Sequence, residues 1–213
     1  RRQCGPRCHY FWGLTEKAVC AIPRTQIPRH QGKGAFMLNV DDLIQLYHFE
    51  PLPVEGGLFR QVYVSPETVP QTALPERYAH DKPLGTAILY LFTTDPNSFS
   101  AMHKLPSDEI YHFYLGDPVE LLQLYPDGHS ERVILGQDIL HGQHVQYVAP
   151  REVWMGSHLL PGGQFALMGT TMAPGFTNDD YIGGEREALI KQYPEEAERI
   201  TRLTRPGEPL LIL

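Results

Sequence analysis

Three ionisable side chains within one short stretch, residues 99–116, are the strongest candidates for acid–base or metal chemistry: His103, Glu109 and His112. If the second half of this stretch is a strand, alternation places Glu109 and Tyr111 on one face and His112 on the other. A carboxylate among aromatic side chains must be paired, metal-bound or partly protonated, because burying it bare is costly. His103 can return to the same face from the neighbouring strand. The pattern predicts an acid–base pair, or half of a metal site.

Each of these side chains has a chemical interpretation and a structural alternative. His103 fits a general base, because the pKa of a histidine lies close to neutral pH and small shifts tune it. Glu109 can orient that base, act as an acid or bind a metal, and Tyr111 can donate a proton to a ligand oxygen. The alternative is that all three have structural roles: His103 and Glu109 are buried with their hydrogen bonds made inside the protein, and Tyr111 is an ordinary core aromatic. His112 faces the other side, so we expect it to pack or to lie at an interface.

Arg60 lies in a predicted strand over residues 55–64, on the same parity as Leu58. An arginine on an apolar strand face is unusual unless it meets an anion. We therefore expect Arg60 either to hold a carboxylate or phosphate of a ligand or to pair with Glu55. Trp154 is expected to form a pocket wall or stacking surface, with ordinary core as its alternative.

Composition limits the classes of protein that fit. The chain has 213 residues with 42% hydrophobic content, which suits one domain with a full-sized core and extensions. No run of 18 apolar residues exists, so we expect no membrane span. Residues 37–213 carry a formal charge of −13, which argues against a nucleic-acid face because phosphate binding needs clustered positive charge.

The first 36 residues differ from the rest. They carry seven Lys or Arg against one acid, together with all three cysteines, Cys4, Cys8 and Cys20. We expect a poorly ordered basic leader, either a targeting segment or an upstream extension, with a weak alternative of a zinc site. The absence of cysteine beyond Cys20 is compatible with a reducing compartment, so a cytoplasmic location is expected.

Elements follow from the spacing of apolar residues. A short helix is predicted from Asn39 to Tyr47, with Asn39 as its cap, and residues 65–83, with four prolines, are predicted to be a long loop that acts as a lid or a dimer arm. Eight short apolar runs with turn residues between them then predict a sandwich or barrel, and two helices close the chain. The runs are 86–92, 98–103, 109–115, 119–124, 131–135, 144–148, 153–157 and 164–172, and the helices are 185–193 and 195–203.

The pattern His103-x5-Glu109-x6-Gly116 resembles the first cupin motif, in which two histidines precede a glutamate and a glycine. Leu105 stands where that motif has its second histidine. Residues 150–155 resemble the second motif, with Met155 at the position of a metal-binding histidine. The resemblance therefore implies a cupin barrel that keeps only His103 and Glu109 as metal ligands, and a thioether is a poor ligand for a hard divalent metal.

More of the chain is similar to the cupin-5 family, also called DUF985, of the RmlC-like cupins. The matching blocks are residues 55–63, 99–121, 148–154 and 172–176. The resemblance implies an all-β fold with flanking helices, a double-stranded β-helix or cupin jelly-roll barrel, over residues 37–205 with a tail at 206–213. It also implies a homodimer and a small-molecule ligand inside the barrel. It does not imply a settled activity.

Three functions remain open at this stage. The first is a metal-independent isomerase or epimerase on a sugar-like or hydroxy-acid substrate, with His103 as base and Tyr111 and Glu109 as further catalytic groups, and no cofactor. The second is a metal-dependent enzyme in which His112 or His144 completes the ligand set of a divalent ion. The third is a binder without catalysis. Residues expected around the ligand are Glu55, Arg60, Phe113, Trp154 and Met155.

Overall fold

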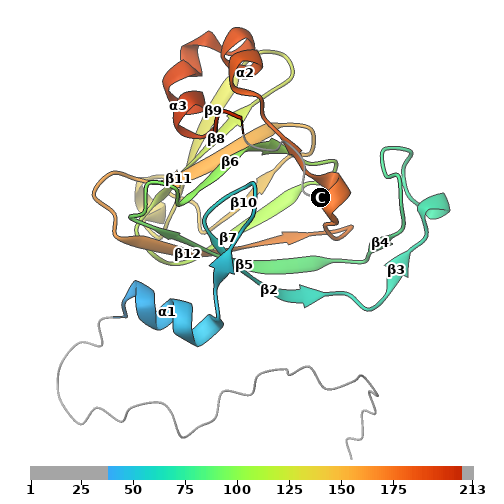
Figure 1. Cartoon of the computed structure of the whole chain (residues 1–213), viewed down its shortest axis with the longest axis horizontal. Coiled ribbons are helices and arrows are strands. Elements are labelled where there is room, and N and C mark those ends of the chain that lie inside the picture. Colours follow the sequence, from blue (N-terminus) through green and yellow to red (C-terminus); the bar gives the residue numbers. More distant parts are fainter. Residues whose placement is uncertain (1–37, 208–213) are drawn as a thin grey trace, which may run out of the picture. The chain divides into compact units, whose positions relative to one another are not determined.

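The computed structural model describes residues 38–207, which form a barrel of antiparallel strands with a helix before it and two helices after it (Figure 1). The α-helices are α1 (Val40–Tyr47), α2 (Arg186–Gln192) and α3 (Ala197–Arg202). The strands are β1 (Glu50–Pro51), β2 (Leu58–Val64), β3 (Thr68–Val69), β4 (Lys82–Pro83), β5 (Thr86–Thr93), β6 (Phe99–Lys104), β7 (Glu109–Gly116), β8 (Val119–Leu124), β9 (Ser130–Leu135), β10 (Gln146–Ala149), β11 (Trp154–Leu159), β12 (Phe165–Met172) and β13 (Ile182–Gly183). Short 3-10 turns are η1 (Gln71–Ala73), η2 (Ile139–His141), η3 (Asn178–Asp180) and η4 (Pro194–Glu196).

Two sheets face one another across the core. One has the strand order β1-β2-β5-β12-β7-β10, and the other has the order β13-β6-β11-β8-β9. Neighbours in each sheet run antiparallel, and strands that are distant in sequence lie side by side, as β5 does with β12. This is the double-stranded β-helix expected from the sequence, a jelly-roll sandwich of two sheets.

Strand β7 shows how alternation builds the interior. Glu109, Tyr111 and Phe113 are buried between the sheets, whereas Ile110 and His112 are only half-buried on the outer face. The predicted division of this strand is confirmed. Its last residue, Gly116, has φ of 102°, and a Cβ there would lie 2.3 Å from the carbonyl oxygen of Phe165. Gly116 is thus required both by its positive φ and by the close approach of the Phe165 backbone, which leaves no room for a side chain.

A β-bulge in β6 places two polar side chains on the same inner face. Met155 pairs with His103 and Ser157 pairs with Ser100, so two residues of β6 stand opposite Gly156 alone. Because of this extra residue, Ser100 and His103 both face the interior although they are three positions apart. Strict alternation would have sent one of them outside.

Helices cover parts of the outer faces of both sheets (Figure 1). Helix α1 packs through Leu43 on Leu91 and Leu167 of the six-stranded sheet, and its cap is the predicted Asn39, whose Oδ1 accepts from the amide of Asp42 at 2.9 Å. Helices α2 and α3 pack on the five-stranded sheet. That cluster includes Phe99, Met102, Leu122, Leu124, Leu189, Tyr193, Ile200 and Leu203.

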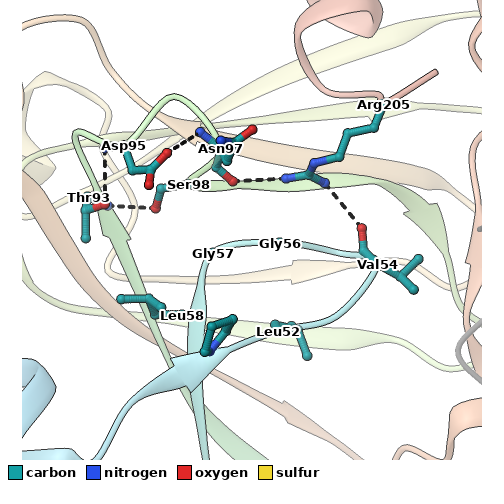
Figure 2. A pocket seen from close by; sticks show the side chains of 11 residues that line it. Leu52, Val54, Gly56, Gly57, Leu58, Thr93, Asp95, Asn97, Ser98 and Arg205 are labelled. Atoms are coloured by element: carbon teal, nitrogen blue, oxygen red, sulfur yellow. Dashed lines mark hydrogen bonds between the residues drawn. The ribbon is translucent and has the colours of Figure 1, made fainter. Parts of the chain in front are cut away.

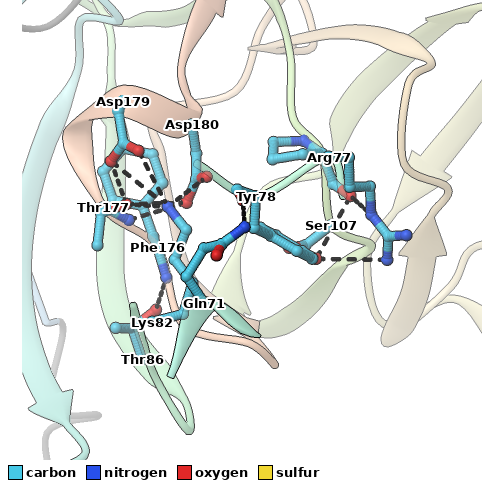
Figure 3. Close-up of polar contacts among 11 residues, drawn as sticks. Gln71, Arg77, Tyr78, Lys82, Thr86, Ser107, Phe176, Thr177, Asp179 and Asp180 are labelled. Atoms are coloured by element: carbon cyan, nitrogen blue, oxygen red, sulfur yellow. Dashed lines mark hydrogen bonds and ion pairs between the residues drawn. The ribbon is translucent and has the colours of Figure 1, made fainter. Parts of the chain in front are cut away.

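The predicted loop of residues 65–83 carries more structure than expected. It contains β3, η1 and β4, and β3 pairs with β4 in a separate two-stranded sheet. Figure 3 shows the contacts of this arm with the barrel. Tyr78 is buried and its hydroxyl lies 2.7 Å from Ser107 Oγ, and Lys82 is buried against η3.

Two further sequence predictions have different outcomes. The basic leader of residues 1–36, with its possible zinc ligands, lies outside the described residues, as does the tail beyond residue 207. Across residues 38–207, no helix is both long and apolar enough to cross a membrane.

Candidate functional site

A cavity of about 470 Å³ opens between the two sheets, a size suited to a small ligand. Its polar wall includes side chains from five parts of the chain. Glu55 comes from the β1–β2 turn, Gln61 from β2, His103 from β6, Glu109 from β7 and Tyr181 from the segment before β13. Apolar groups complete the wall, among them Leu52, Phe59, Ile88, Leu105, Met172 and Phe176.

His103 is held in one orientation. It is 2% exposed, and its Nδ1 lies 2.7 Å from the carbonyl oxygen of Ala101. A carbonyl can only accept, so Nδ1 carries a proton, and in the neutral ring Nε2 keeps the lone pair. The ring stacks on Tyr181, with centroids 5.1 Å apart and planes inclined by 17°. The imidazole therefore presents a fixed basic nitrogen at the cavity wall.

Glu109 is the most electrostatically unusual group of the site. It is 8% exposed, and its Oε2 has no hydrogen-bond partner among the described residues. That oxygen lies 3.9 Å from Nε2 of His103. Burial raises the pKa of the Glu109 carboxyl, His103 opposes the rise, and the charge of Glu55 adds to it. The carboxyl is thus biased towards its protonated form.

The backbone around Glu55 explains the Gly-Gly pair that follows it. Gly56 and Gly57 have φ of 97° and 68°. Tyr90 donates its hydroxyl to the carbonyl of Gly56 at 2.6 Å, and a Cβ on Gly57 would lie 2.2 Å from that hydroxyl oxygen. The turn can therefore press close to Tyr90. The side chain of Glu55 accepts from Ser100 Oγ at 2.6 Å.

A second pocket, of about 340 Å³, lies on the other side of this turn (Figure 2). Arg205 spans it, donating to the carbonyls of Val54 and Glu55 at 3.2 and 3.1 Å and to that of Asn97 at 2.9 Å. Its guanidinium also lies 3.9 Å from the ring centroid of Phe99. Arg205 thus fastens the chain after α3 to the turn that carries Glu55.

Tyr111, Phe113 and Met155 lie inside the barrel but behind the cavity wall. The Tyr111 hydroxyl donates to Met155 Sδ at 3.5 Å, and burial raises the pKa of that hydroxyl well above its usual value. Tyr111 also borders a space of about 10 Å³, room for one water, with Glu109 and Ser157. Phe113 and Met155 belong to the packed core between the sheets.

Of the five residues expected around the ligand, Glu55 alone lines this cavity; Phe113 and Met155 lie behind its wall, and Arg60 and Trp154 lie on outer faces of the sheets. Arg60 is exposed and pairs with Leu89, which belongs to the cluster under α1, so its face of β2 is the outer one. Arg60 does lie on the same face of β2 as Leu58, as predicted, but that face is the one on which Leu58 packs with α1 and not the one that lines the cavity. Trp154 packs in the cluster under α2 and α3, with Lys104 Nζ 5.2 Å from its ring centroid.

Tyr181 and Gln61 were missed by sequence reasoning. Tyr181 is 1% exposed, and its hydroxyl has no partner among residues 38–207. It stands between η3 and β13, where no periodicity marks a face. Gln61 lies next to Arg60 on the inner side of β2, so the opposite choice of parity would have found it.

The donor set does not fit a resident metal ion. Within the part of the chain that the structure describes, no group of three or more His, Cys, Asp or Glu side chains could hold one. Leu105 lies on the cavity wall beside His103 and Glu109. The two histidines considered as third ligands are elsewhere, since His112 lies 2.9 Å from Thr171 Oγ1 on the outer face and His144 is exposed.

Comparison with known proteins matches this chain to one family model. Residues 41–182 match the model described as cupin superfamily (DUF985). An uncharacterised protein of Saccharomyces cerevisiae is 29% identical over 162 residues, which cover 70% of this chain and 78% of the yeast protein. The crystal structure of a Shewanella oneidensis protein is 30% identical with a TM-score of 0.69, covering 80% of this chain and all of that one. A hypothetical protein from Leishmania major is 25% identical with a TM-score of 0.70, covering 78% and 99%. The descriptions of these three proteins name no reaction.

Proposed function

Since this chain belongs to the cupin superfamily family DUF985, we propose that its barrel binds a small molecule and that His103 moves a proton on it. The observation that carries this proposal is the environment of His103. Its Nδ1 is tied to the Ala101 carbonyl, and its free Nε2 faces the unpartnered Oε2 of Glu109. A fixed base beside a carboxyl group whose pKa is raised by burial is an arrangement that acid–base catalysis uses.

The reaction class that suits this pair is isomerisation or epimerisation next to a carbonyl. His103 Nε2 takes the proton from the carbon beside the carbonyl, and protonated Glu109 gives its proton to the carbonyl oxygen, which leaves an enol. In the second half of the turnover, protonated His103 returns a proton to carbon and the enol hydroxyl gives its proton back to Glu109, so the carbonyl group is restored and both residues regain their starting states. The Tyr181 hydroxyl, buried and unpartnered, is a second donor to a ligand oxygen. Tyr181 takes the donor role first expected of Tyr111, because Tyr111 lies behind the wall.

Solvent deuterium exchange tests this function. Purified protein is incubated in D₂O with a series of keto-sugars, and incorporation of deuterium at carbon is followed by NMR. We expect exchange that His103→Gln lowers by about a hundredfold or more. His112→Gln is the matched control. That histidine lies on the outer face of β7, so its loss should leave exchange unchanged. Retained ligand binding without any exchange would favour a binder without catalysis.

We also propose a homodimer formed through the outer face of the six-stranded sheet. One row of side chains crosses this face beyond the part that α1 covers. Strand pairing aligns Tyr63, Ala87, Thr171, Ile110 and Val148 in that order. Tyr63 and Val148, at its two ends, are 52% and 49% exposed. Ala87, Ile110 and Thr171 between them are partly exposed, and a mostly apolar row of this kind is typical of an interaction surface.

A further inference from the structure

The wall of the cavity is acidic. Glu55 and Glu109 line it together, and of the described residues around it none is Lys or Arg. The same two carboxyl groups also border the small space behind the wall, so they lie close to one another. A ligand that brought a carboxylate or phosphate into this cavity would add negative charge without a partner, which is costly away from water.

Cations near the cavity are already engaged. Lys82, fully buried, lies 2.7 Å from Asp180 and 3.4 Å from Asp179. Arg205 donates to backbone carbonyls on both sides of the second pocket, as Figure 2 shows. Arg60 is on the outer face. None of these side chains is placed to neutralise a carboxyl group of the cavity.

Acceptors for a cation are open at the same wall. Glu109 Oε2 is buried and unpartnered, and the hydroxyl of Tyr181 is also without a partner among the described residues. Glu55 receives one hydrogen bond, from Ser100, on Oε1. A protonated amine has three donors and no acceptor, so it matches these oxygens. The rings of Phe59 and Tyr181 on the wall attract a cation as well.

From these contacts we infer that the cavity takes a small hydroxylated ligand that carries a protonated amine, with the ammonium group beside Glu55. The inference rests on the proposed function, since it names the class of molecule on which His103 acts. Hydroxyl groups of the ligand meet Gln61 and Tyr181. Compounds whose carboxylate or phosphate must enter the cavity are excluded.

Three probes of one size and different charge test this class: glucosamine, glucose and glucuronate. Binding to the full chain is measured by isothermal titration calorimetry. We expect glucosamine to bind about tenfold or more tightly than glucose, and glucuronate to bind most weakly. Glu55→Gln should remove most of the preference for the amine while leaving the affinity for glucose nearly unchanged. Equal or tighter binding of glucuronate, or binding of none of the three, would overturn the inference.

Two controls keep this test separate from that of the proposed function. Glu131→Gln changes a half-exposed carboxylate on β9 and should leave the order of the probes intact. Thermal denaturation of each variant checks that the fold is retained. Exchange that depends on His103 without any preference for the amine would overturn this inference alone. Preference for the amine without exchange would overturn the proposed function alone.

Discussion

Glu109 is a carboxyl group that the barrel holds away from water, where its ionised form would be solvated. The residue begins β7, lines the cavity together with Tyr181 and Met172, and has one oxygen without a hydrogen-bond partner among residues 38–207. A carboxylate left in this way costs free energy of folding, and groups held at such a cost cluster at functional sites. Glu109 therefore connects the chemistry of the cavity to the stability of the chain.

Replacing this carboxyl group should stabilise the protein in a pH-dependent way. Burial raises the pKa of Glu109 above its ordinary value of 4.5. Between the ordinary and the raised value, the unfolded chain has lost a proton that the folded chain retains, so stability falls as pH rises through this window. Below the ordinary value both states hold the proton and the penalty vanishes. We expect Glu109→Gln to be more stable than the natural chain by about 1 kcal/mol at about pH 8, and equal to it at about pH 4.

Urea denaturation of both chains at the two pH values measures this difference. Glu76→Gln is the matched control, because Glu76 is exposed and its replacement should change stability little at either pH. A Glu109→Gln chain that is less stable than the natural one at about pH 8 would contradict the expected sign.

For single residues, the sequence predicted correctly on which face of a strand some side chains lie, and failed for others. Alternation correctly separated Glu109 and Tyr111 from His112, because a strand with one buried face has an unambiguous pattern. Arg60 and Trp154 were placed on the ligand wall, whereas Arg60 is exposed on the outer face of β2 and Trp154 packs on an outer face beneath α2 and α3; both outer faces also carry apolar side chains that pack on helices. Pattern alone cannot distinguish two buried faces. Tyr181 could not be found, since an isolated residue between two short elements has no period.

At the scale of elements, the β3–β4 arm and the rim of the cavity form one unit. Lys82 of β4 reaches η3, where it pairs with Asp180 and Asp179 and contacts Thr177 (Figure 3). The next residue after η3 is Tyr181, which stacks on His103. A buried ion pair thus fixes the segment that supplies part of the cavity wall. The four prolines predicted a loop here, and the buried lysine gave no signal that it would be tied down.

Breaking this ion pair should be costly. Lys82→Met leaves Asp180 buried without its partner, and loss of one member of a buried pair costs about 3–5 kcal/mol. Lys104→Met is the matched control, because Lys104 and Glu152, 3.4 Å apart, have side chains that are 28% and 49% exposed, and a pair open to solvent contributes at most about 1 kcal/mol. Chemical denaturation measures both. A double change, Lys82→Met with Asp180→Leu, should recover part of the loss, and equal costs for the two lysine variants would contradict this account.

For the whole molecule, short apolar runs without helices between them were enough to predict a sandwich or barrel, and the resemblance to the cupin motifs implied which of these folds it is. Strand order was not available from the runs, because neighbours such as β5 and β12 are about 80 residues apart and their pairing depends on the closed fold. The bulge opposite Gly156 was also unpredictable, since it arises from pairing between β6 and β11. Fold class thus followed from local pattern, whereas the composition of the cavity wall depended on these long-range registers.

The proposed homodimer gives the prediction at this largest scale. Val148 lies on β10, which is an edge strand of the six-stranded sheet. It stands at one end of the row of side chains described above, and Tyr63 stands at the other end. Val148→Glu places a charge in an apolar interface, which should weaken association by about a hundredfold. Ile182→Glu is the matched control, because Ile182 is a similarly exposed β-branched residue on the edge strand of the other sheet. Sedimentation velocity should show a dimer for the natural chain and the Ile182 variant, and a monomer for the Val148 variant at the same micromolar concentration. A natural chain that sediments as a monomer, or a Val148 variant that stays dimeric, would contradict an interface on this face.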